Sequence, residues 1–175
     1  ASFSAFLIGR LETIRVAVAY NKTNVKLAGT HAGIGIGEDG TSQMGLEDVA
    51  AMRALPNMTV LQPADDAETR QMTDWMVAHE GPVFIRLTRQ NVDDVHDASY
   101  RFALGKADTV YEPAGAKKGV KLQAAVFASG GTVGPAVAAA KDLFKRGFRV
   151  RVVNAGSLAP FDRDAVARAA ADCQR

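Results

Sequence analysis

Four polar side chains of complementary chemistry occur where a small polar molecule could be bound: His31, Asp39, Gln43 and Arg89. Arginine binds a phosphate in a bidentate way, while aspartate and glutamine form hydrogen bonds with hydroxyl groups. The set therefore suits a phosphorylated molecule that carries several hydroxyl groups. Structural explanations stay open, because Arg89 could be a solvated charge at a strand end and Asp39 could shape an Asx-turn.

Alternating strands and helices must position these side chains. Short runs of apolar and β-branched residues predict strands, which we expect at 25–28, 58–61, 82–88, 122–128 and 148–153. Apolar residues at helical spacing, together with acidic caps, predict helices, which we expect at 6–20, 46–55, 65–80, 133–146 and after Asp162. Strands and helices that alternate in this way form parallel βαβ units with right-handed crossovers.

The predicted fold class is therefore α/β, with parallel, doubly wound sheets in two incomplete domains. Residues 1–98 make up the first domain and residues 121–175 the second. Between 90 and 119 the alternation breaks, and Asp, Gly, Pro and Lys become frequent. We assign residues 99–120 to a linker that carries an edge hairpin around 101–111.

This topology brings the four polar residues to one edge of the first sheet. His31 comes directly after the first predicted strand and Arg89 directly after the third. Asp39 and Gln43 lie on the glycine-rich loop 33–45 that follows the first strand. All four are expected at the carboxyl ends of the strands, where α/β folds bind their ligands.

A dinucleotide site in the same loop is disfavoured. Gly35, Gly37 and Gly40 satisfy the pattern G-x-G-x-x-G, which is weakly specific by itself. However, Glu38 and Asp39 lie inside the pattern, and two carboxylates would repel a pyrophosphate. The turn is also too long, because the following helix begins only near residue 46.

Composition excludes several classes of protein. With 21 Lys and Arg against 19 Asp and Glu, the 175-residue chain has a net charge of +2, which argues against a nucleic-acid partner. No apolar run approaches the roughly 18 residues of a membrane span, and the first ten residues lack the positive region of a secretory signal. Cys173 is the only cysteine, so no internal disulfide can form. We therefore expect a cytoplasmic protein without a membrane partner.

The segment THAGIGIGEDGTSQMGLEDVAAMRALPNMTVLQPAD, residues 30–65, resembles the pyrimidine-binding domain of transketolase, a thiamine diphosphate-dependent enzyme. The resemblance continues through GPVFIRLTRQN at 81–91. It resumes at FASGGTVGPAVAAAKDLFKRGFRVRVVNAGSLAPFD, which is similar to the start of the family's C-terminal domain. The resemblance implies a transferase that moves a two-carbon ketol unit from a ketose phosphate to an aldose phosphate, with the cofactor as electron sink.

The resemblance also implies a cofactor pocket near the N-terminus. Phe3 matches the aromatic residue that stacks on the aminopyrimidine ring, and Phe6 matches a second aromatic residue of that pocket. From composition alone, both would be assigned to the apolar core at the start of a helix.

The substrate residues implied by the resemblance coincide with the four polar residues named above. His31 and Arg89 match residues that hold the substrate phosphate, and Asp39 matches a carboxylate that recognises a hydroxyl near the reacting carbon. Gln43 occupies a position that is His in one branch of the family and Gln in another. No catalytic histidine is therefore assigned there.

Neither a catalytic residue nor a metal ligand is assigned within the 175 residues. In the family, the glutamate that protonates the pyrimidine lies upstream of the segment that matches Phe3. A separate N-terminal domain holds the diphosphate and its Mg²⁺ or Ca²⁺. We expect a fragment that is inactive in isolation, with sugar phosphates as substrates. Its protein partner is expected to be a second copy in a homodimer, or a separate diphosphate-binding domain or subunit.

Three alternatives stay open. A deoxyxylulose-phosphate synthase typically has a histidine where Gln43 stands, and a ketoacid dehydrogenase β subunit usually lacks the GEDG-x-SQ pattern. The third alternative is a non-catalytic, transketolase-like binding module.

Overall fold

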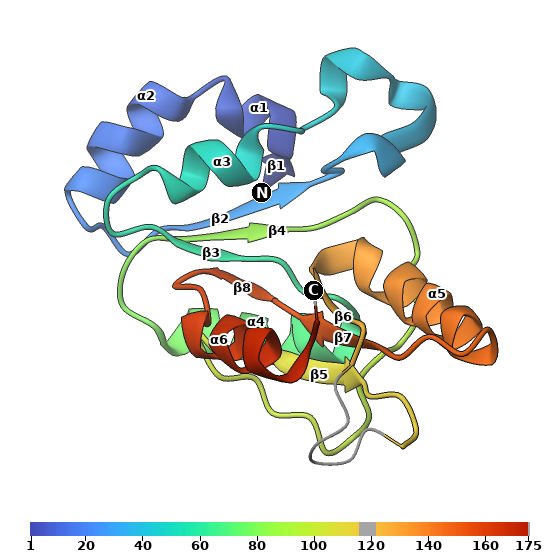
Figure 1. Ribbon diagram of the computed structural model, residues 1–175. Coiled ribbons are helices and arrows are strands. Elements are labelled where there is room, and N and C mark those ends of the chain that lie inside the picture. The colour runs from blue at the N-terminus through green and yellow to red at the C-terminus, as the bar shows by residue number, and fades with distance from the viewer. Residues whose placement is uncertain (116–121, 175) are drawn as a thin grey trace.

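The computed structural model describes residues 1–115 and 122–174, which form two sheets flanked by helices (Figure 1). The first sheet has the strand order β1-β2-β4-β3-β8, with β1 at Ser2–Phe3, β2 at Lys26–Thr30, β3 at Thr59–Leu61, β4 at Val83–Arg86 and β8 at Ser157–Ala159. The second has the order β5-β7-β6, with β5 at Asp108–Tyr111, β6 at Ala124–Ala128 and β7 at Val150–Asn154. The predicted α/β class is confirmed.

Helices cover both faces of the first sheet, as a parallel sheet requires. On one face lie α1 (Ser4–Ile8), α2 (Leu11–Thr13), a π-helical segment (Ile14–Tyr20) and α3 (Asp48–Arg53), while α4 (Asp66–Ala78) covers the other (Figure 1). The single helix predicted at 6–20 is thus divided into three short pieces. The second sheet packs against α5 (Val133–Lys145), and the last helix is α6 (Arg163–Asp172).

Side-chain alternation along β3 and β4 explains this layering. Val60 and Phe84 point toward α3 and the π-helical segment, where both are fully buried. Their neighbours Leu61, Val83 and Ile85 point to the opposite face and pack against methionines of α4. Because side chains alternate along a strand, a short apolar run can fill the core on both faces of the sheet.

Two edge strands differ from the prediction. The hairpin predicted around 101–111 does not form: this segment contributes one strand, β5, which pairs antiparallel with β7. The first sheet gains β8, which runs antiparallel to β3 and comes from the C-terminal part of the chain. β5 and β8 are thus antiparallel edges of sheets whose other pairings are parallel. Strands of three or four residues carry too little periodicity to reveal their partners in the sequence.

Asp65 caps α4, as the sequence predicts, and it also binds Val95 and His96 in the segment that follows β4. Its Oδ1 accepts the backbone N–H of Glu68 at 2.9 Å, while its Oδ2 accepts the backbone N–H groups of Val95 and His96 at 3.0 and 2.9 Å. The Nδ1 of His96 lies 2.9 Å from the same oxygen. Burial would raise the pKa of Asp65, but these hydrogen bonds outweigh it, so the pKa lies below its ordinary value.

Glu68 extends this polar network into the second sheet. Its carboxylate accepts the hydroxyl of Tyr100 at 2.7 Å and the Asn154 amide of β7 at 2.9 and 3.0 Å. His96 lies in the same network, and its side chain is only 1% exposed although the surrounding sequence is polar. Buried polar groups need such partners, and here they join α4, the linker and β7.

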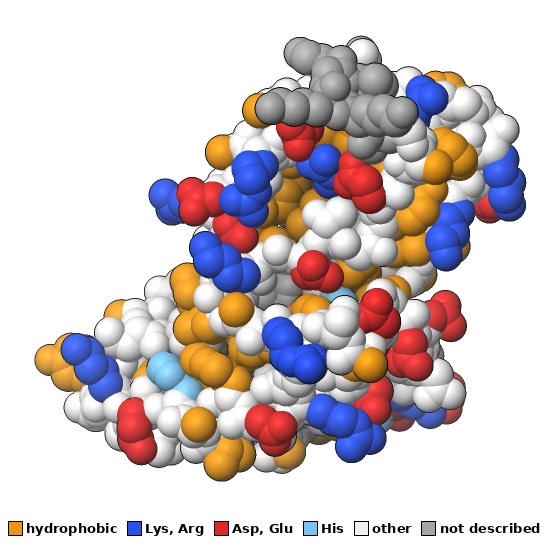
Figure 2. Space-filling view, turned by 90° about the horizontal axis from the view of Figure 1, so that it is seen from below, with side chains coloured by type: hydrophobic (Ala, Val, Ile, Leu, Met, Phe, Trp, Pro, Cys, Tyr) orange, Lys and Arg blue, Asp and Glu red, His pale blue; other side chains and the backbone are white. Residues whose placement is uncertain are grey.

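Charges of both signs are interspersed on one face of the molecule. Figure 2 shows Lys and Arg side chains among Asp and Glu side chains over the face seen from below. This distribution agrees with the near-zero net charge of the sequence.

Candidate functional site

Three aromatic rings stack at the carboxyl ends of β1 and β2. Phe3 pairs with Thr30 in parallel, and the rings of Phe3 and His31 lie 4.1 Å apart at an angle of 18°. The ring of Phe6, in α1, stacks on Phe3 at 5.5 Å and 8°. Phe3 therefore stacks on both other rings, while Phe6 stacks on Phe3 and is 52% exposed.

His31 is held in an unusual backbone conformation. Its φ of 54° lies in the left-handed region, which residues other than glycine rarely adopt. Its Nδ1 lies 3.0 Å from the hydroxyl of Thr30, which in turn donates to the carbonyl of Ser2 at 3.3 Å. Strained residues of this kind persist where the surrounding structure holds them, and they concentrate at functional sites.

The glycine-rich loop 33–45 is closed at its base and folded into short 3₁₀ turns at Ile34–Asp39, which Gly37 interrupts, and at Thr41–Gln43. The N–H of Gly33 donates to the carbonyl of Gly45 at 2.9 Å. Gly40, with a φ of 74°, separates the two segments in a conformation that favours glycine. Asp39 and Gln43 are half-buried on this loop, and neither side chain has a hydrogen bond to another described residue.

Arg89 reaches the same loop from the segment after β4. Its guanidinium donates to the carbonyl of Ile36 and to the carboxylate of Glu38, both at 2.6 Å. The hydrogen bond with Arg89 lowers the pKa of Glu38 from 4.5 to about 2. The pKa of Arg89 is raised by that hydrogen bond, by the charge of Glu38 and, to a smaller extent, by the charge of Asp39.

The structure thus gathers the six predicted residues at the carboxyl edge of the first sheet. Phe3, Phe6 and His31 make one aromatic column, while Arg89 lies close enough to Asp39 for their charges to interact. Gln43 shares the loop with Asp39 but contacts neither the column nor the arginine through a hydrogen bond among the described residues.

Two features of this site are not evident from the sequence. From the sequence, Glu38 is only a carboxylate that would repel a pyrophosphate. In the structure, it is the ion-pair partner of Arg89. A second ion pair, between Arg86 and Asp48, lies beside the site with side-chain exposures of 15% and 0%. The sequence does contain one sign of the second pair, the arginine at the end of the apolar strand VFIR. A buried charge requires a partner of opposite charge.

Within residues 1–115 and 122–174, no group of three or more His, Cys, Asp or Glu side chains could hold a metal ion. None of the helices in this part of the chain is long and apolar enough to cross a membrane.

Comparison with known proteins gives two family matches in succession. Residues 1–94 match the family model "Transketolase, pyrimidine binding domain", and residues 117–175 match "Transketolase, C-terminal domain". The chain is 36% identical over 170 residues to one subunit of the apulose-4-phosphate transketolase of Actinobacillus succinogenes, which covers 97% of this chain and 52% of that protein. It is 34% identical to human transketolase over 163 residues, which covers 93% of this chain and 25% of that protein.

Solved structures give the same result. A split gene transketolase, described as an inactive beta4 tetramer, matches with a TM-score of 0.85 and 37% identity over 98% of this chain and 53% of that one. Transketolase from Leishmania mexicana matches with a TM-score of 0.77 and 33% identity over 91% of this chain and 23% of that one. The chain spans about half the length of the first curated relatives that it matches. By sequence and by fold, the chain belongs to the transketolase family.

Proposed function

We propose that this chain is the pyrimidine-binding part of a thiamine diphosphate-dependent transketolase, which transfers a two-carbon ketol unit between a ketose phosphate and an aldose phosphate. The observation that carries the proposal is the column of Phe6, Phe3 and His31, which lies at the same sheet edge as Arg89 and Asp39. When bound, the cofactor would supply the nucleophilic carbon and the electron sink for the reaction.

The aromatic column suits a flat heteroaromatic ring. Stacking on an exposed aromatic face is favourable because it buries apolar area and allows offset π contact. The resemblance implies that Phe3 stacks on the aminopyrimidine, but Phe3 already stacks on both His31 and Phe6, whereas Phe6 is 52% exposed. We therefore assign the stacking contact with the aminopyrimidine to Phe6. Phe3 then acts as the support of Phe6.

Polar groups of the loop suit the sugar phosphate. Arg89 uses two of its five N–H groups for Ile36 and Glu38, so three donors remain for a phosphate. Asp39 would accept a hydrogen bond from a substrate hydroxyl, and His31 and Gln43 would offer further polar contacts. Glu38 would keep Arg89 oriented and would lose part of this pairing when a phosphate binds.

The diphosphate and its Mg²⁺ or Ca²⁺ would be held by another domain, another subunit or a second copy of the protein, and the glutamate that protonates the pyrimidine would also lie outside these 175 residues. Two relatives are named as individual subunits of transketolases, which supports a partner of this kind. We place the protein in the cytoplasm, where its buried single thiol would stay reduced.

The test is cofactor binding by the full-length protein together with the partner that holds the diphosphate. Isothermal titration with thiamine diphosphate and Mg²⁺ should show binding, and Phe6→Ala should weaken it. The isolated 175-residue chain should not bind the cofactor tightly. Micromolar affinity of the isolated chain would contradict this division of roles, and unchanged affinity of Phe6→Ala would contradict the stacking contact.

Substrate recognition is tested by kinetics of the same assembly. Arg89→Ala should raise KM for phosphorylated sugars by about 10- to 100-fold, because a charge-assisted hydrogen bond contributes about 1.5–3 kcal/mol. Asp39→Ala should reduce turnover of hydroxylated donors more than turnover of donors that lack the hydroxyl. An unchanged KM would exclude the phosphate role of Arg89, and equal losses would mean that Asp39 only shapes the loop.

A further inference from the structure

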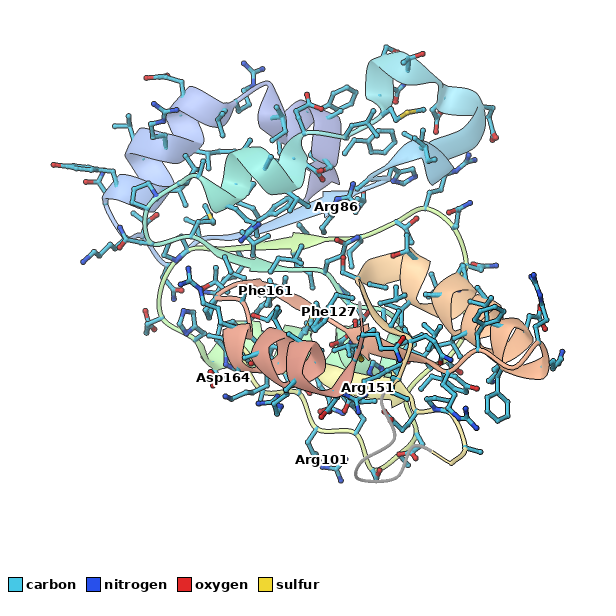
Figure 3. All side chains as sticks on the ribbon, viewed as in Figure 1. Arg86, Arg101, Phe127, Arg151, Phe161 and Asp164 are labelled. Carbon is cyan, nitrogen blue, oxygen red and sulfur yellow. The ribbon has the colours of Figure 1, made fainter. Side chains whose placement is uncertain are left out.

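A buried ion pair lies beside the segment that carries the aromatic column. The Nε of Arg86 donates to Asp48 Oδ2 at 2.8 Å, and the hydroxyl of Ser4 donates to the same oxygen. Ser4 and Asp48 are both fully buried, and in Figure 3 Arg86 lies on the side of the first sheet that faces α1 and α3. The three residues are far apart in the sequence, so their contact exists only in the folded chain.

This cluster joins the segments that carry the site. Ser4 directly follows Phe3, and Arg86 ends β4, three residues before Arg89. A second group of Arg86, Nη2, donates to the carbonyl of Gly45 at 3.1 Å. That carbonyl also accepts the N–H that closes the glycine-rich loop. The guanidinium therefore links the end of β4 to the end of the loop directly, and to Ser4 at the start of α1 through Asp48.

Two glycines allow the backbone of β2 and of the loop end to approach Ser4 closely. A Cβ at Gly45 would lie 2.9 Å from the Cβ of Ser4, and a Cβ at Gly29 would lie 2.9 Å from the hydroxyl of Ser4. Contacts this short leave no room for a side chain. The segment that carries Phe3 is therefore held at a fixed distance from both β2 and the end of the loop.

The cluster is an inefficient way to stabilise a fold. A buried ion pair loses hydration, and apolar residues of similar size are often as stabilising or more so. Here the second oxygen of Asp48, Oδ1, is buried without a hydrogen-bond partner among the described residues, which adds to the cost. Directional bonds, by contrast, fix geometry in a way that apolar contacts do not.

We propose that Arg86 and Asp48 are positioning residues of the site: their ion pair, with Ser4, holds Phe3 stacked on His31 and Phe6 and fixes the end of the loop. The importance of this geometry for catalysis rests on the proposed function. The stacking of Phe3 on His31 can be measured without any ligand.

The test replaces the whole cluster by apolar residues in the full-length protein, with Ser4→Ala, Asp48→Val and Arg86→Met combined. In protein labelled with ¹³C-histidine, the signal of His31 is the one that disappears in His31→Gln; this assignment is needed because His79 and His96 also stack on aromatic rings. Because the two rings stack, the ring current of Phe3 should shift the ring protons of His31 upfield in the wild type. The variant should remain folded, should lose this shift, and should bind thiamine diphosphate with its partner and Mg²⁺ on the order of 100-fold more weakly.

A matched control removes an exposed pair of the same residue types. Arg70 and Asp66 form an i,i+4 ion pair on α4, with side chains 75% and 66% exposed. Asp66→Val combined with Arg70→Met should leave both the His31 signal and cofactor affinity unchanged. If the triple variant does not fold, Arg86→Lys carries the test, because lysine keeps the charge but lacks the fork that contacts both Asp48 and Gly45. It should lose part of the shift and part of the affinity.

A folded triple variant with the wild-type His31 shift would overturn the proposal, and so would Arg86→Lys with both properties unchanged. A lost shift with unchanged cofactor affinity would also overturn the role in the site. If wild-type protein with its partner fails to bind the cofactor, the proposed function is wrong, while the His31 signal still decides whether the cluster holds the stack.

Discussion

Arg89 shows how one residue can serve both the loop and a ligand. It donates to the backbone at Ile36 and to the carboxylate of Glu38, so the loop segment that carries Asp39 is tied to the end of β4. Glu38 is exposed, and a pair of this kind contributes little to global stability because solvent screens it. Its consequence is local: it sets the orientation of the guanidinium.

The titration of Glu38 tests whether this pair exists in solution. Its pKa in the folded protein, about 2, lies below the ordinary value of 4.5. Because the folded value is the lower one, the stabilising contribution is complete above pH 4.5 and is lost as the pH falls toward 2. NMR of the Glu38 carboxyl carbon should give a midpoint near 2 in the wild type, and Arg89→Gln should return it toward 4.5. A wild-type midpoint already near 4.5 would mean that the pair does not form.

At the scale of elements, two glycines with different surroundings give opposite predictions. Gly131 lies in the 3₁₀ turn before α5, where a Cβ would meet the side chains of Val92 and Thr88 at an ordinary 3.4 and 3.6 Å. Gly156 precedes β8, where a Cβ would lie 2.3 Å from Glu68 Oε1 and 2.7 Å from the Met72 Cε. Gly131→Ala should raise the free energy of unfolding by about 0.4–1 kcal/mol, because the unfolded chain becomes less flexible. Gly156→Ala should lower it by about 1–3 kcal/mol through overpacking.

Urea denaturation of the two variants measures both changes. They serve as controls for each other, because each adds one methyl group. Destabilisation of similar size in both variants would mean that the space around Gly156 is not as restricted as the contacts indicate.

At the scale of the whole molecule, the C-terminal part of the chain completes the first sheet. β8 covers the edge of β3, and the N–H of Gln62 donates to the carbonyl of Gly156 at 2.7 Å. Asn154 of β7 adds a buried contact with Glu68 of α4. An uncovered strand edge and an unpaired buried carboxylate are both unfavourable, so the two sheets should depend on each other.

We therefore expect the 175-residue chain to unfold in one cooperative transition, whereas residues 1–98 alone should show no cooperative transition in urea. Native-state hydrogen exchange gives a second measurement. The amide of Gln62 should open with the same free energy as the amides of β4, because both belong to one sheet. Cooperative unfolding of residues 1–98, or much faster exchange at Gln62, would contradict this dependence.

The sequence by itself determined most of the local elements and the family. The acidic residues Asp65 and Asp162 cap α4 and α6 as predicted, because a cap is satisfied by an N–H only three residues away. The apolar strands at 58–61 and 82–88 were likewise visible, since burial on both faces leaves a continuous apolar run. The GEDG loop and the strand-end arginine were sufficient to identify the family, since residue types and spacing alone define both.

Only the tertiary structure decided how distant segments meet. The pairing of Arg86 with Asp48 spans 38 residues, and that of Ser4 with Asp48 spans 44. The burial of His96 and the addition of β8 to the first sheet likewise depend on contacts between remote parts of the chain. A residue's type shows that it needs a partner, but the choice among many equivalent partners follows from which surfaces pack together. That choice depends on the geometry of the whole fold, which short-range patterns in the sequence do not contain.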